Sequence, residues 1–515
     1  MKAQQPIFTF IDLFSGIGGF RLALNNLGGA CLNFSEINKD AINTYCTNFN
    51  EDSGYNLGDI TKIRNLPKHD LLTAGVPCQS WSIAGRNLGF DDDRGQLWND
   101  TIYLLHKSRP KAFIFENVKG LADPRNKEAL RYILNRIKAA GYYAGFYVLN
   151  SFDYGVPQNR VRIYIVGFLE EKFYLKFKVA KAVKEKIRLA DIIADAELNE
   201  PFDIRVLQKD LFDQPVLARN MSLSNNKGFN DYFLFNDLRN GHSTVHSWDI
   251  FETTDRQKAI CYLLLKNRRK SAYGHLDGNP LSLKHFQALD KSIEQPELDE
   301  LVKLRILSEE NYAFSISNFD WAGLGNDELT LLNCAIDNQL NIDLLKSNRS
   351  LKLNKVNIAK SINSLSEKGI LVCSEIRYDF KNTKISTGLN GINRVFLPSS
   401  NIFPTLVASD SNDFVALRDV NAPDVTAFKH NFIEQIYKPG LFRKITKQEA
   451  CMAQGFPKGF LLPDSRARWM KLLGNSVSVP VVQMLGKAIA ETGVFQNDLE
   501  NENPLNQSEF AKSVF

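Results

Sequence analysis

The sequence predicts an α/β fold in which the first 170 residues form a doubly wound, largely parallel sheet. Short apolar runs rich in β-branched and aromatic residues alternate there with segments of helical periodicity. Three glycines at positions 16, 18 and 19 follow the first run and mark a tight turn that opens a helix. With 515 residues, of which 44% are hydrophobic, the chain is long enough for two or three domains.

Each predicted strand is six to eight residues long, the length of a buried strand between two turns. The strands are expected at residues 8–14, 31–36, 70–75, 112–117, 143–150 and 161–168. Helical patterns separate most of them, at residues 20–28, 39–49 and 127–141. Because helices between strands act as crossover connections, this alternation predicts mainly parallel strand pairs.

The rest of the chain divides into a long middle part, a compact helical segment and a polar tail, at residues 171–442, 443–495 and 496–515. Within the middle part, stretches 281–317 and 351–380 resemble each other. Each predicts a helix rich in Leu and Ile, a turn, an Ile-Leu pair and a short polar hairpin. That order is the outline of a winged helix, a shape used for DNA binding and for purely structural roles.

Composition limits the classes of function. The net charge of +5 and the pI near 8.6 permit a nucleic-acid partner without requiring one. Basic residues gather at 266–270 and between Lys346 and Lys360, although such runs are as often solvated surface. The seven cysteines show no metal-ligand spacing and suit a reducing cytosol, so we expect no metal and a cytoplasmic location. No apolar run approaches the roughly 18 residues that span a membrane.

The glycine turn has an acidic partner at the end of the second predicted strand. Glu36 lies twenty residues after Gly16, where a carboxylate can hydrogen-bond a ribose diol, and Asp59 could read an adenine amino group. The N–H groups at the start of a helix add positive potential. These residues predict a nucleoside-bearing cofactor. The glycine spacing departs from GxGxxG, which weakens the case for NAD as the cofactor and favours S-adenosylmethionine. The alternative is that the glycines only make the turn and bind no cofactor.

Several separated motifs occur together and cover roughly residues 8–168 and 443–490. With them the chain resembles the DNA cytosine-5 methyltransferases, most closely the bacterial enzymes of restriction–modification systems. The matching motifs are DLFSGIGGFRLAL, SEI at 35–37, GDI at 58–60, GVPCQSWSIAG, RGQLW at 94–98, FENVKGL, DYGVPQNRVRIYIVGF, RKITKQEACMAQGFP and GNSVSVP. The resemblance implies a Rossmann-like S-adenosylmethionine-dependent methyltransferase domain, completed by residues 443–495, with a large target-recognition region inserted at 171–442.

The resemblance also assigns roles to single residues. It implies that Cys78 is the nucleophile, that Glu116 contacts N3 of the cytosine, and that Arg162 holds its O2 with Arg160 in support. Without the resemblance, a lone cysteine is usually a small buried hydrophobe. Cofactor contacts are implied for Phe14, Ser15, Gly16, Ile17, Gly18, Gly19, Glu36, Ile37, Asp59, Ile60, Pro77, Leu97, Asn475 and Ser476, with Leu97 on a mobile catalytic loop. DNA contacts are expected from Gln79, Ser80, Arg394, Thr405 and Leu406.

The implied chemistry needs these residue types. Attack of a thiolate at C6 makes the cytosine ring an enamine, so C5 can accept a methyl group, and the thiolate can later leave. A protonated Glu116 would offset the charge that builds up when sulfur adds. Because a duplex hides C5 and C6, the base must rotate out of the stack, and the loop from Gln79 to Gly95 is a candidate lid.

Double-stranded DNA is the expected partner, and a cognate restriction endonuclease acting on the same site is a further candidate partner. Protection of host DNA would then be the role of the methylation, and we expect a monomer. The inserted part at roughly 200–380 could extend the DNA footprint, pair with a nuclease or repress a promoter.

Three other functions compete with this one. A transfer-RNA cytosine-5 methyltransferase would share the fold and the cofactor, but PCQSWS matches the DNA enzymes better. A non-catalytic DNA-binding relative would be expected to lose Cys78 or Glu116, and both are present. An NAD oxidoreductase would leave PCQ, ENV and QNRVR unexplained. Methyl transfer to duplex DNA or to structured RNA separates the first alternative from the main hypothesis.

Overall fold

The computed structural model describes the chain in eleven stretches, at residues 5–77, 93–183, 187–196, 232–235, 244–251, 253–276, 278–381, 391–400, 402–420, 422 and 425–496. The chain forms two compact units. Unit 1 consists of Met1–Tyr232 and Phe396–Phe515, and unit 2 consists of Phe233–Val395. The functional domain boundaries drawn from the sequence stay a prediction.

Unit 1 is built on a six-stranded sheet with the strand order β2-β1-β3-β4-β7-β5. Its strands are β1 (Phe8–Leu13), β2 (Gly29–Ser35), β3 (Leu71–Gly75), β4 (Ala112–Val118), β7 (Val161–Phe168) and β5 (Tyr143–Asn150). β1 pairs in parallel with β2 and β3, and β3 with β4. β7 runs antiparallel to both β4 and β5. The prediction of a doubly wound, largely parallel sheet is confirmed, with β7 as the reversed strand.

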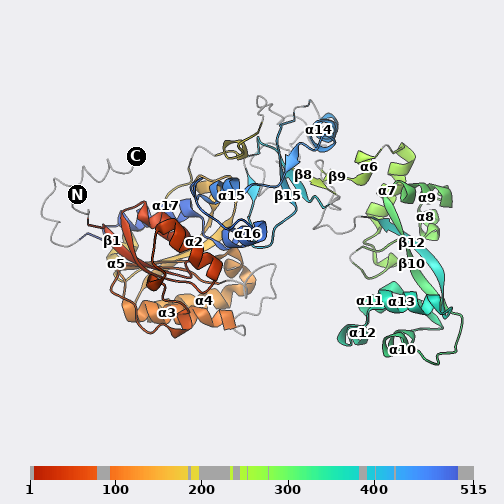
Figure 1. The fold of residues 1–515 in the computed structure, drawn as a ribbon, viewed down its shortest axis with the longest axis horizontal. Helices are drawn as coiled ribbons and strands as arrows, with labels where there is room; N and C mark the ends of the chain where they lie inside the picture. The colour runs from red at the N-terminus through yellow and green to blue at the C-terminus, as the bar shows by residue number, and fades with distance from the viewer. Residues whose placement is uncertain are drawn as a thin grey trace. The chain divides into compact units, whose positions relative to one another are not determined.

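Helices cover both faces of this sheet (Figure 1), namely α1 (Gly19–Asn25), α2 (Lys39–Phe49), α3 (Asp93–Ser108), α4 (Lys127–Ala139) and α17 (Val479–Ala490). Ile133 of α4 and Trp98 of α3 are fully buried in one core with Phe113 and Phe115 of β4. This core fixes β4, the strand that carries Glu116. Burial of such large apolar side chains contributes roughly 1.5–3 kcal/mol each.

The C-terminal segment of unit 1 packs against its beginning. α17 lies on α1, where a Cβ built on Gly486 would come within 2.8 Å of the Leu24 side chain. Two further helices precede α17, α15 (Lys447–Gln454) and α16 (Arg466–Asn475). The other α-helices and strands described outside unit 2 are α5 (Glu171–Lys176), β6 (Gln158–Asn159), β14 (Phe403–Pro404), β15 (Asp413–Ala416), α14 (Val425–Phe432) and β16 (Phe442–Arg443).

Unit 2 contains a three-stranded antiparallel sheet with the order β11-β10-β12. Its strands and helices are β8 (Tyr232–Phe235), β9 (Thr244–Val245), α6 (Ser247–Ile250), α7 (Asp255–Asn267), α8 (Leu283–Leu289), α9 (Gln295–Lys303), β10 (Leu307–Ile316), α10 (Asn326–Leu332), β11 (Gln339–Asn341), α11 (Ile342–Ser347), α12 (Arg349–Leu353), α13 (Ile358–Glu367), β12 (Leu371–Phe380) and the beginning of β13 (Arg394–Phe396). None of the helices in the described stretches is long and apolar enough to cross a membrane.

The two short polar hairpins expected in this region were wrong. Each of the two stretches instead ends in a single strand of ten residues, β10 and β12, and these pair with one another along their whole length. Neither strand has a glycine or a proline at its middle, so nothing in the local sequence turns the chain.

Candidate active site

The glycine turn between β1 and α1 is held in a left-handed backbone conformation. Gly16 has φ +55° and Gly18 has φ +87°, a backbone region that residues other than glycine rarely adopt. A Cβ at Gly18 would come within 2.3 Å of the Phe49 ring, whereas one at Gly16 would meet nothing within 4 Å. The turn is therefore packed on one side and open at Gly16.

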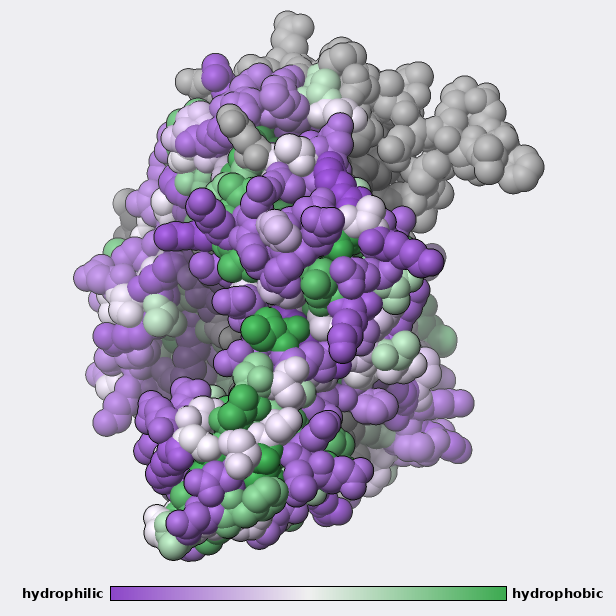
Figure 2. All heavy atoms as spheres, turned by 90° about the vertical axis from the view of Figure 1, so that its right-hand side faces the viewer, coloured by the Kyte–Doolittle hydropathy of each residue, from purple (hydrophilic) through white to green (hydrophobic). Residues whose placement is uncertain are grey.

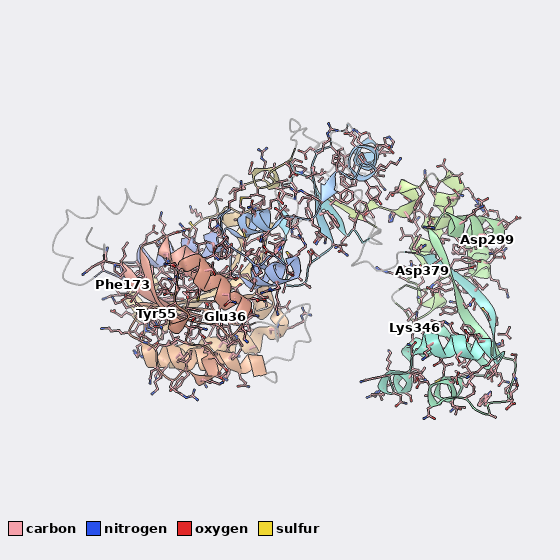
Figure 3. The ribbon with its side chains drawn as sticks, in the orientation of Figure 1. Glu36, Tyr55, Phe173, Asp299, Lys346 and Asp379 are labelled. Atoms are coloured by element: carbon pink, nitrogen blue, oxygen red, sulfur yellow. The ribbon has the colours of Figure 1, made fainter. Side chains whose placement is uncertain are left out.

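Glu36 ties this turn to the end of β2. One carboxylate oxygen accepts the backbone N–H of Gly16 at 2.9 Å, and the other accepts those of Ile37 and Asn38 at 2.8 Å each. Figure 3 labels Glu36 in unit 1. The neighbouring Ile37 side chain is 73% exposed. An oriented carboxylate thus stands beside an uncovered apolar side chain, a combination that suits a ligand with hydroxyl groups and a flat ring.

Asp59 and Ile60 have different surroundings. Asp59 caps a short 3-10 helix by accepting the backbone N–H of Thr61 at 3.0 Å and its hydroxyl at 2.8 Å. Those hydrogen bonds hold the pKa of Asp59 below its usual range, so the group is an acceptor at neutral pH. Ile60 is only 4% exposed and belongs to the core. Only the backbone groups of Ile60 are therefore available to a ligand, because its side chain packs into the core.

The other residues implied around the cofactor lie mostly in buried positions. Ser15 is buried, and among the described residues its hydroxyl has no hydrogen-bond partner. A Cβ at Gly19 would come within 2.7 Å of Val477, so the late motif lies against the start of α1. In that motif Asn475 is exposed, and Ser476 donates its hydroxyl to the Leu473 carbonyl. The open space at Gly16 and the unpartnered Ser15 hydroxyl fit a polar cofactor here.

Three of these residues need separate mention. Phe14 has φ 52° and is partly buried, and Pro77 is partly buried after β3. Leu97 does not lie on a loop, as the sequence suggested, but inside α3, where its carbonyl accepts the Thr101 hydroxyl at 2.7 Å. Its half-buried side chain packs against the core. Apolar residues at helical spacing around Leu97 explain why α3 begins before this residue.

Glu116 and Arg162 form an ion pair near the end of β4. Arg162 Nε lies 3.1 Å from a carboxylate oxygen of Glu116, and both side chains are largely buried. Burial raises the pKa of Glu116, while the nearby guanidinium groups of Arg162 and Arg160 oppose this rise. In register, Glu116 lies beside Gly75 of β3. The carboxyl group is thereby placed on the strand next to the one that leads to residue 78.

Arg160 has a different task from Arg162. It is 2% exposed, and its guanidinium donates to the carbonyls of Leu406 at 3.2 Å, Gly474 at 3.0 Å and Ser476 at 2.6 Å. The guanidinium thus joins the residue between β6 and β7 to the segment after β14 and to the late motif. Arg160 is a positioning residue, since these contacts are all with backbone of the protein.

Replacing Arg160 with alanine should lower the free energy of unfolding of unit 1 by about 3 kcal/mol or more. Three buried carbonyls would lose a charged donor. Those of Leu406 and Gly474 would lose the donor described above, at a cost of about 1–3 kcal/mol each before the structure relaxes, whereas that of Ser476 keeps the amide of Gln454. Denaturant unfolding measures this loss. Arg125→Ala is the control, because Arg125 forms an exposed ion pair with Asp123 and should change stability by less than about 1 kcal/mol. Equal losses in both variants would contradict the role of Arg160.

The residues expected to touch DNA are only partly described. Cys78, Gln79 and Ser80 lie outside the described residues. Thr405 donates its hydroxyl to the Asn159 carbonyl at 2.5 Å, and Leu406 is 3% exposed. These contacts give Thr405 and Leu406 a structural role, and DNA contact by either stays a prediction, as it does for Arg394 in β13.

Sequence reasoning missed three residues that shape the site. Asn117 donates its side-chain amide to the Val76 carbonyl at 3.2 Å and so holds the backbone just before Pro77. Gln454 donates to the carbonyls of Ser476 and Val477, and Gln158 donates to that of Ala453. All three lie inside quoted motifs, and amides in buried motif positions were the available signal. Among the described residues no group of three or more His, Cys, Asp or Glu side chains could hold a metal ion.

Comparison with known proteins covers nearly the whole chain. A family model described as C-5 cytosine-specific DNA methylase matches residues 8–491. The Type II methyltransferase M.HgiBI of Herpetosiphon aurantiacus is 38% identical over 494 residues, 96% of this chain and 99% of that protein. M.BanI of Aneurinibacillus aneurinilyticus is 29% identical over 513 residues, 95% and 96% of the two chains. A solved structure of the Entamoeba histolytica methyltransferase EhMeth aligns with a TM-score of 0.45 and 14% identity, covering 95% of this chain and 98% of that chain.

Proposed function

The chain belongs to the family of C-5 cytosine-specific DNA methylases, and from that premise we propose how its residues carry out the reaction. It is a DNA cytosine-5 methyltransferase of the bacterial restriction–modification type. The proposal is that the methyl donor is S-adenosylmethionine and that Cys78 bonds covalently to C6 of a cytosine rotated out of the duplex. The observation that carries it is the buried carboxyl group of Glu116, held by Arg162 beside the strand that leads to Cys78.

The cofactor would occupy the open side of the glycine turn. Glu36 would accept hydrogen bonds from ribose hydroxyls, Ile37 would cover one face of the adenine, and Ser15 would supply a further polar contact. When bound, S-adenosylmethionine supplies an electrophilic methyl group for C5. The turn needs no phosphate-binding spacing for this donor, which agrees with its departure from GxGxxG.

The steps on the base use Cys78 and Glu116. The Cys78 thiolate adds to C6, and a proton on Glu116 passes to N3, so the ring becomes a neutral enamine that is nucleophilic at C5. After C5 has been methylated, its proton leaves to a base. The electrons of that C–H bond then re-form the C5–C6 double bond, the thiolate departs, and Glu116 recovers the proton from N3. Burial favours the protonated form of Glu116 at the start of this sequence.

Incubation of the protein with labelled S-adenosylmethionine tests the proposal. We expect methyl transfer to duplex DNA, and bisulfite sequencing should place 5-methylcytosine at one short recurring motif. A structured transfer RNA run in parallel should take up no label. Incorporation into the RNA alone would contradict the proposal. Digestion of the methylated DNA with a nuclease that cuts the same motif would then test protection, and sedimentation would test the expected monomer.

Gly16→Ala should weaken binding of S-adenosylmethionine at least about tenfold, beyond its effect on stability. Both Gly16 and Gly440 have positive φ, and a Cβ at either meets nothing within 4 Å. The conformational strain of alanine there costs about 1–2 kcal/mol at each site. Only at Gly16 would the methyl group enter the space proposed for the cofactor. Gly440→Ala is therefore the matched control, with calorimetric titration and thermal unfolding as the measurements; equal affinities in the two variants would place the cofactor elsewhere.

A further inference from the structure

Unit 2 is organised around one long antiparallel ribbon of β10 and β12. The register runs from Leu307 opposite Phe380 at one end to Ile316 opposite Leu371 at the other. Two separate hydrophobic cores lie on this ribbon. The first packs α7, α8 and α9 against Leu307 and Phe380, and we call it the first lobe. The second packs α10, α11, α12 and α13 against Ile316 and Leu371, and we call it the second lobe.

The two lobes repeat the same order of elements and exchange strands. In the first lobe a bridge at Leu281 is followed by α8, α9 and β10, and Leu281 pairs with Tyr378 of β12. In the second lobe β11 is followed by α11, α12, α13 and β12, and β11 pairs with β10. Each lobe therefore has a short strand, then two helices in the first lobe or three in the second, and part of both long strands. That order is the one expected of a winged helix, in which the last helix before the long strand is presented to DNA.

The second lobe carries a free basic surface. Its core takes Leu351, Ile362 and Leu365, while the opposite sides of α12 and α13 are exposed. The basic surface consists of five exposed side chains, at Lys346, Arg349, Lys352, Lys355 and Lys360. Within the described part of the chain, no carboxylate lies within 4.0 Å of any of them. Ala359 and Asn363 lie exposed between these charges on α13, so the helix could approach a groove closely.

The corresponding surface of the first lobe has the opposite character. Residues 281–305 contain five acidic and four basic residues, whereas residues 341–368 contain two acidic and six basic ones. In the first lobe Arg256 of α7 donates to Asp290 at 2.7 Å and to Glu297 of α9 at 2.8 Å. The last helix of that lobe is therefore fastened to α7 and presents Asp299 and Glu300. Figure 3 labels Asp299 in the first lobe and Lys346 in the second.

One residue of the other basic run of unit 2 is used inside the fold, whereas Lys266, Arg269 and Lys270 of the same run are exposed. Arg268, in the cluster at 266–270, is 2% exposed and donates to Asp379 of β12 at 2.5 Å. This buried pair joins the end of α7 to the ribbon. Figure 2 shows a face of unit 2 on which hydrophilic side chains predominate and hydrophobic ones form small groups. The difference between the lobes is therefore one of net charge: basic residues exceed acidic ones by four at 341–368, whereas acidic residues exceed basic ones by one at 281–305.

We propose that the second lobe docks onto duplex DNA through this basic surface, with α13 toward the groove and the five cations on phosphates, while the first lobe makes no such contact. The inference rests on the proposed function, which supplies duplex DNA as the substrate. Charge complementarity selects DNA, because exposed and unpaired cations on a helix–turn–helix release counterions when they meet phosphates. Phosphates give the docking without sequence preference, so the second lobe adds affinity rather than the choice of target.

The test compares two triple variants of the full chain. Lys352→Gln/Lys355→Gln/Lys360→Gln removes three charges from the second lobe, and Lys284→Gln/Lys291→Gln/Lys303→Gln removes three exposed charges from the first. Binding to a duplex of about 40 base pairs is measured by fluorescence anisotropy over a range of salt. The second-lobe variant should bind about tenfold or more weakly, with a salt slope smaller by about 2 to 3, since each phosphate contact contributes about 0.9. Lys360→Gln alone should reduce the slope by about 0.9.

The first-lobe variant should bind like the unaltered protein. Equal affinity and slope in both triple variants would overturn the inference, whether or not the enzyme methylates DNA. Thermal unfolding of both variants confirms that surface charge alone has changed. If the second-lobe variant shows the expected smaller slope while the unaltered protein methylates no DNA, the docking surface stands and the proposed function fails. If the enzyme methylates DNA but all three proteins bind it identically, the proposed function stands and the docking surface fails.

Discussion

Cys78→Ser should leave a protein that binds S-adenosylmethionine and duplex DNA but transfers methyl groups about 10⁴-fold or more slowly. A cysteine thiol ionises far more readily than a serine hydroxyl, so only the thiol can supply the anionic nucleophile at an appreciable rate. Single-turnover transfer of labelled methyl groups measures the loss. A duplex with 5-fluorocytosine at the target gives a second readout, because fluorine cannot leave C5 as a proton does. The unaltered protein should be trapped covalently and the variant should not.

Cys46→Ser provides the matched control for this result. Cys46 is a free, half-buried cysteine on α2, away from the predicted nucleophile in sequence, and its exchange should change the rate less than twofold. Retention of more than about a tenth of the activity by Cys78→Ser would exclude Cys78 as the nucleophile. Loss of cofactor binding in Cys78→Ser would point to a structural effect instead.

Glu116→Gln should reduce the rate of methyl transfer about 10²–10⁴-fold, because an amide cannot pass a proton to N3. The pKa of Glu116 is raised by burial, so the protonated acid is present below that raised pKa and is lost as pH rises through it. The rate of the unaltered enzyme should therefore fall along a high-pH limb that is missing in Glu116→Gln. A pH profile of single-turnover rates measures both effects.

The same carboxyl group gives a readout without activity. Because its folded pKa lies above the ordinary 4.5, its contribution to the free energy of unfolding is fully present below about 4.5 and is lost as pH rises through the raised value. Glu116→Gln should flatten that loss. Glu449→Gln is the control, because the pKa of Glu449 is shifted in the opposite direction. Burial alone would raise that pKa, but hydrogen bonds from Arg443 and Thr446 hold it below its usual range. Its contribution is present above about 4.5 and disappears as pH falls. Equal pH slopes in the two variants would contradict the assignment.

Local sequence patterns predicted the sheet well because its elements are local. The strand at 8–14 became β1, and the one at 143–150 became β5, since runs of apolar residues bounded by turns need no distant information. The direction of β7 was not predictable in this way. It depends on pairing with both β4 and β5, and the sequence of a strand does not specify which way its neighbour runs.

The site divides along the same line. Gly16 and Glu36 belong to one strand–helix–strand unit, so a spacing of twenty residues was enough to expect both at the same site, although their hydrogen bond was not predicted. The task of Arg160 could not be predicted, because its partners lie 246 to 316 residues further along the chain. For the same reason the repeat at 281–317 and 351–380 was visible, but the exchange of strands between its two copies was not.

The packing of α17 on α1 bears on how the enzyme is made in the cell. The two helices are separated by some 450 residues of chain, yet together they complete one face of unit 1. A ribosome adds about 5–20 residues per second, so roughly 20 to 90 seconds pass before α17 can reach α1. During that time the apolar side of the nascent sheet stays without its last cover and would benefit from a chaperone. Because α17 and the preceding late motif are made some 450 residues after α1, each newly made molecule can complete the side of the sheet that carries the glycine turn only after the whole middle part has been synthesised.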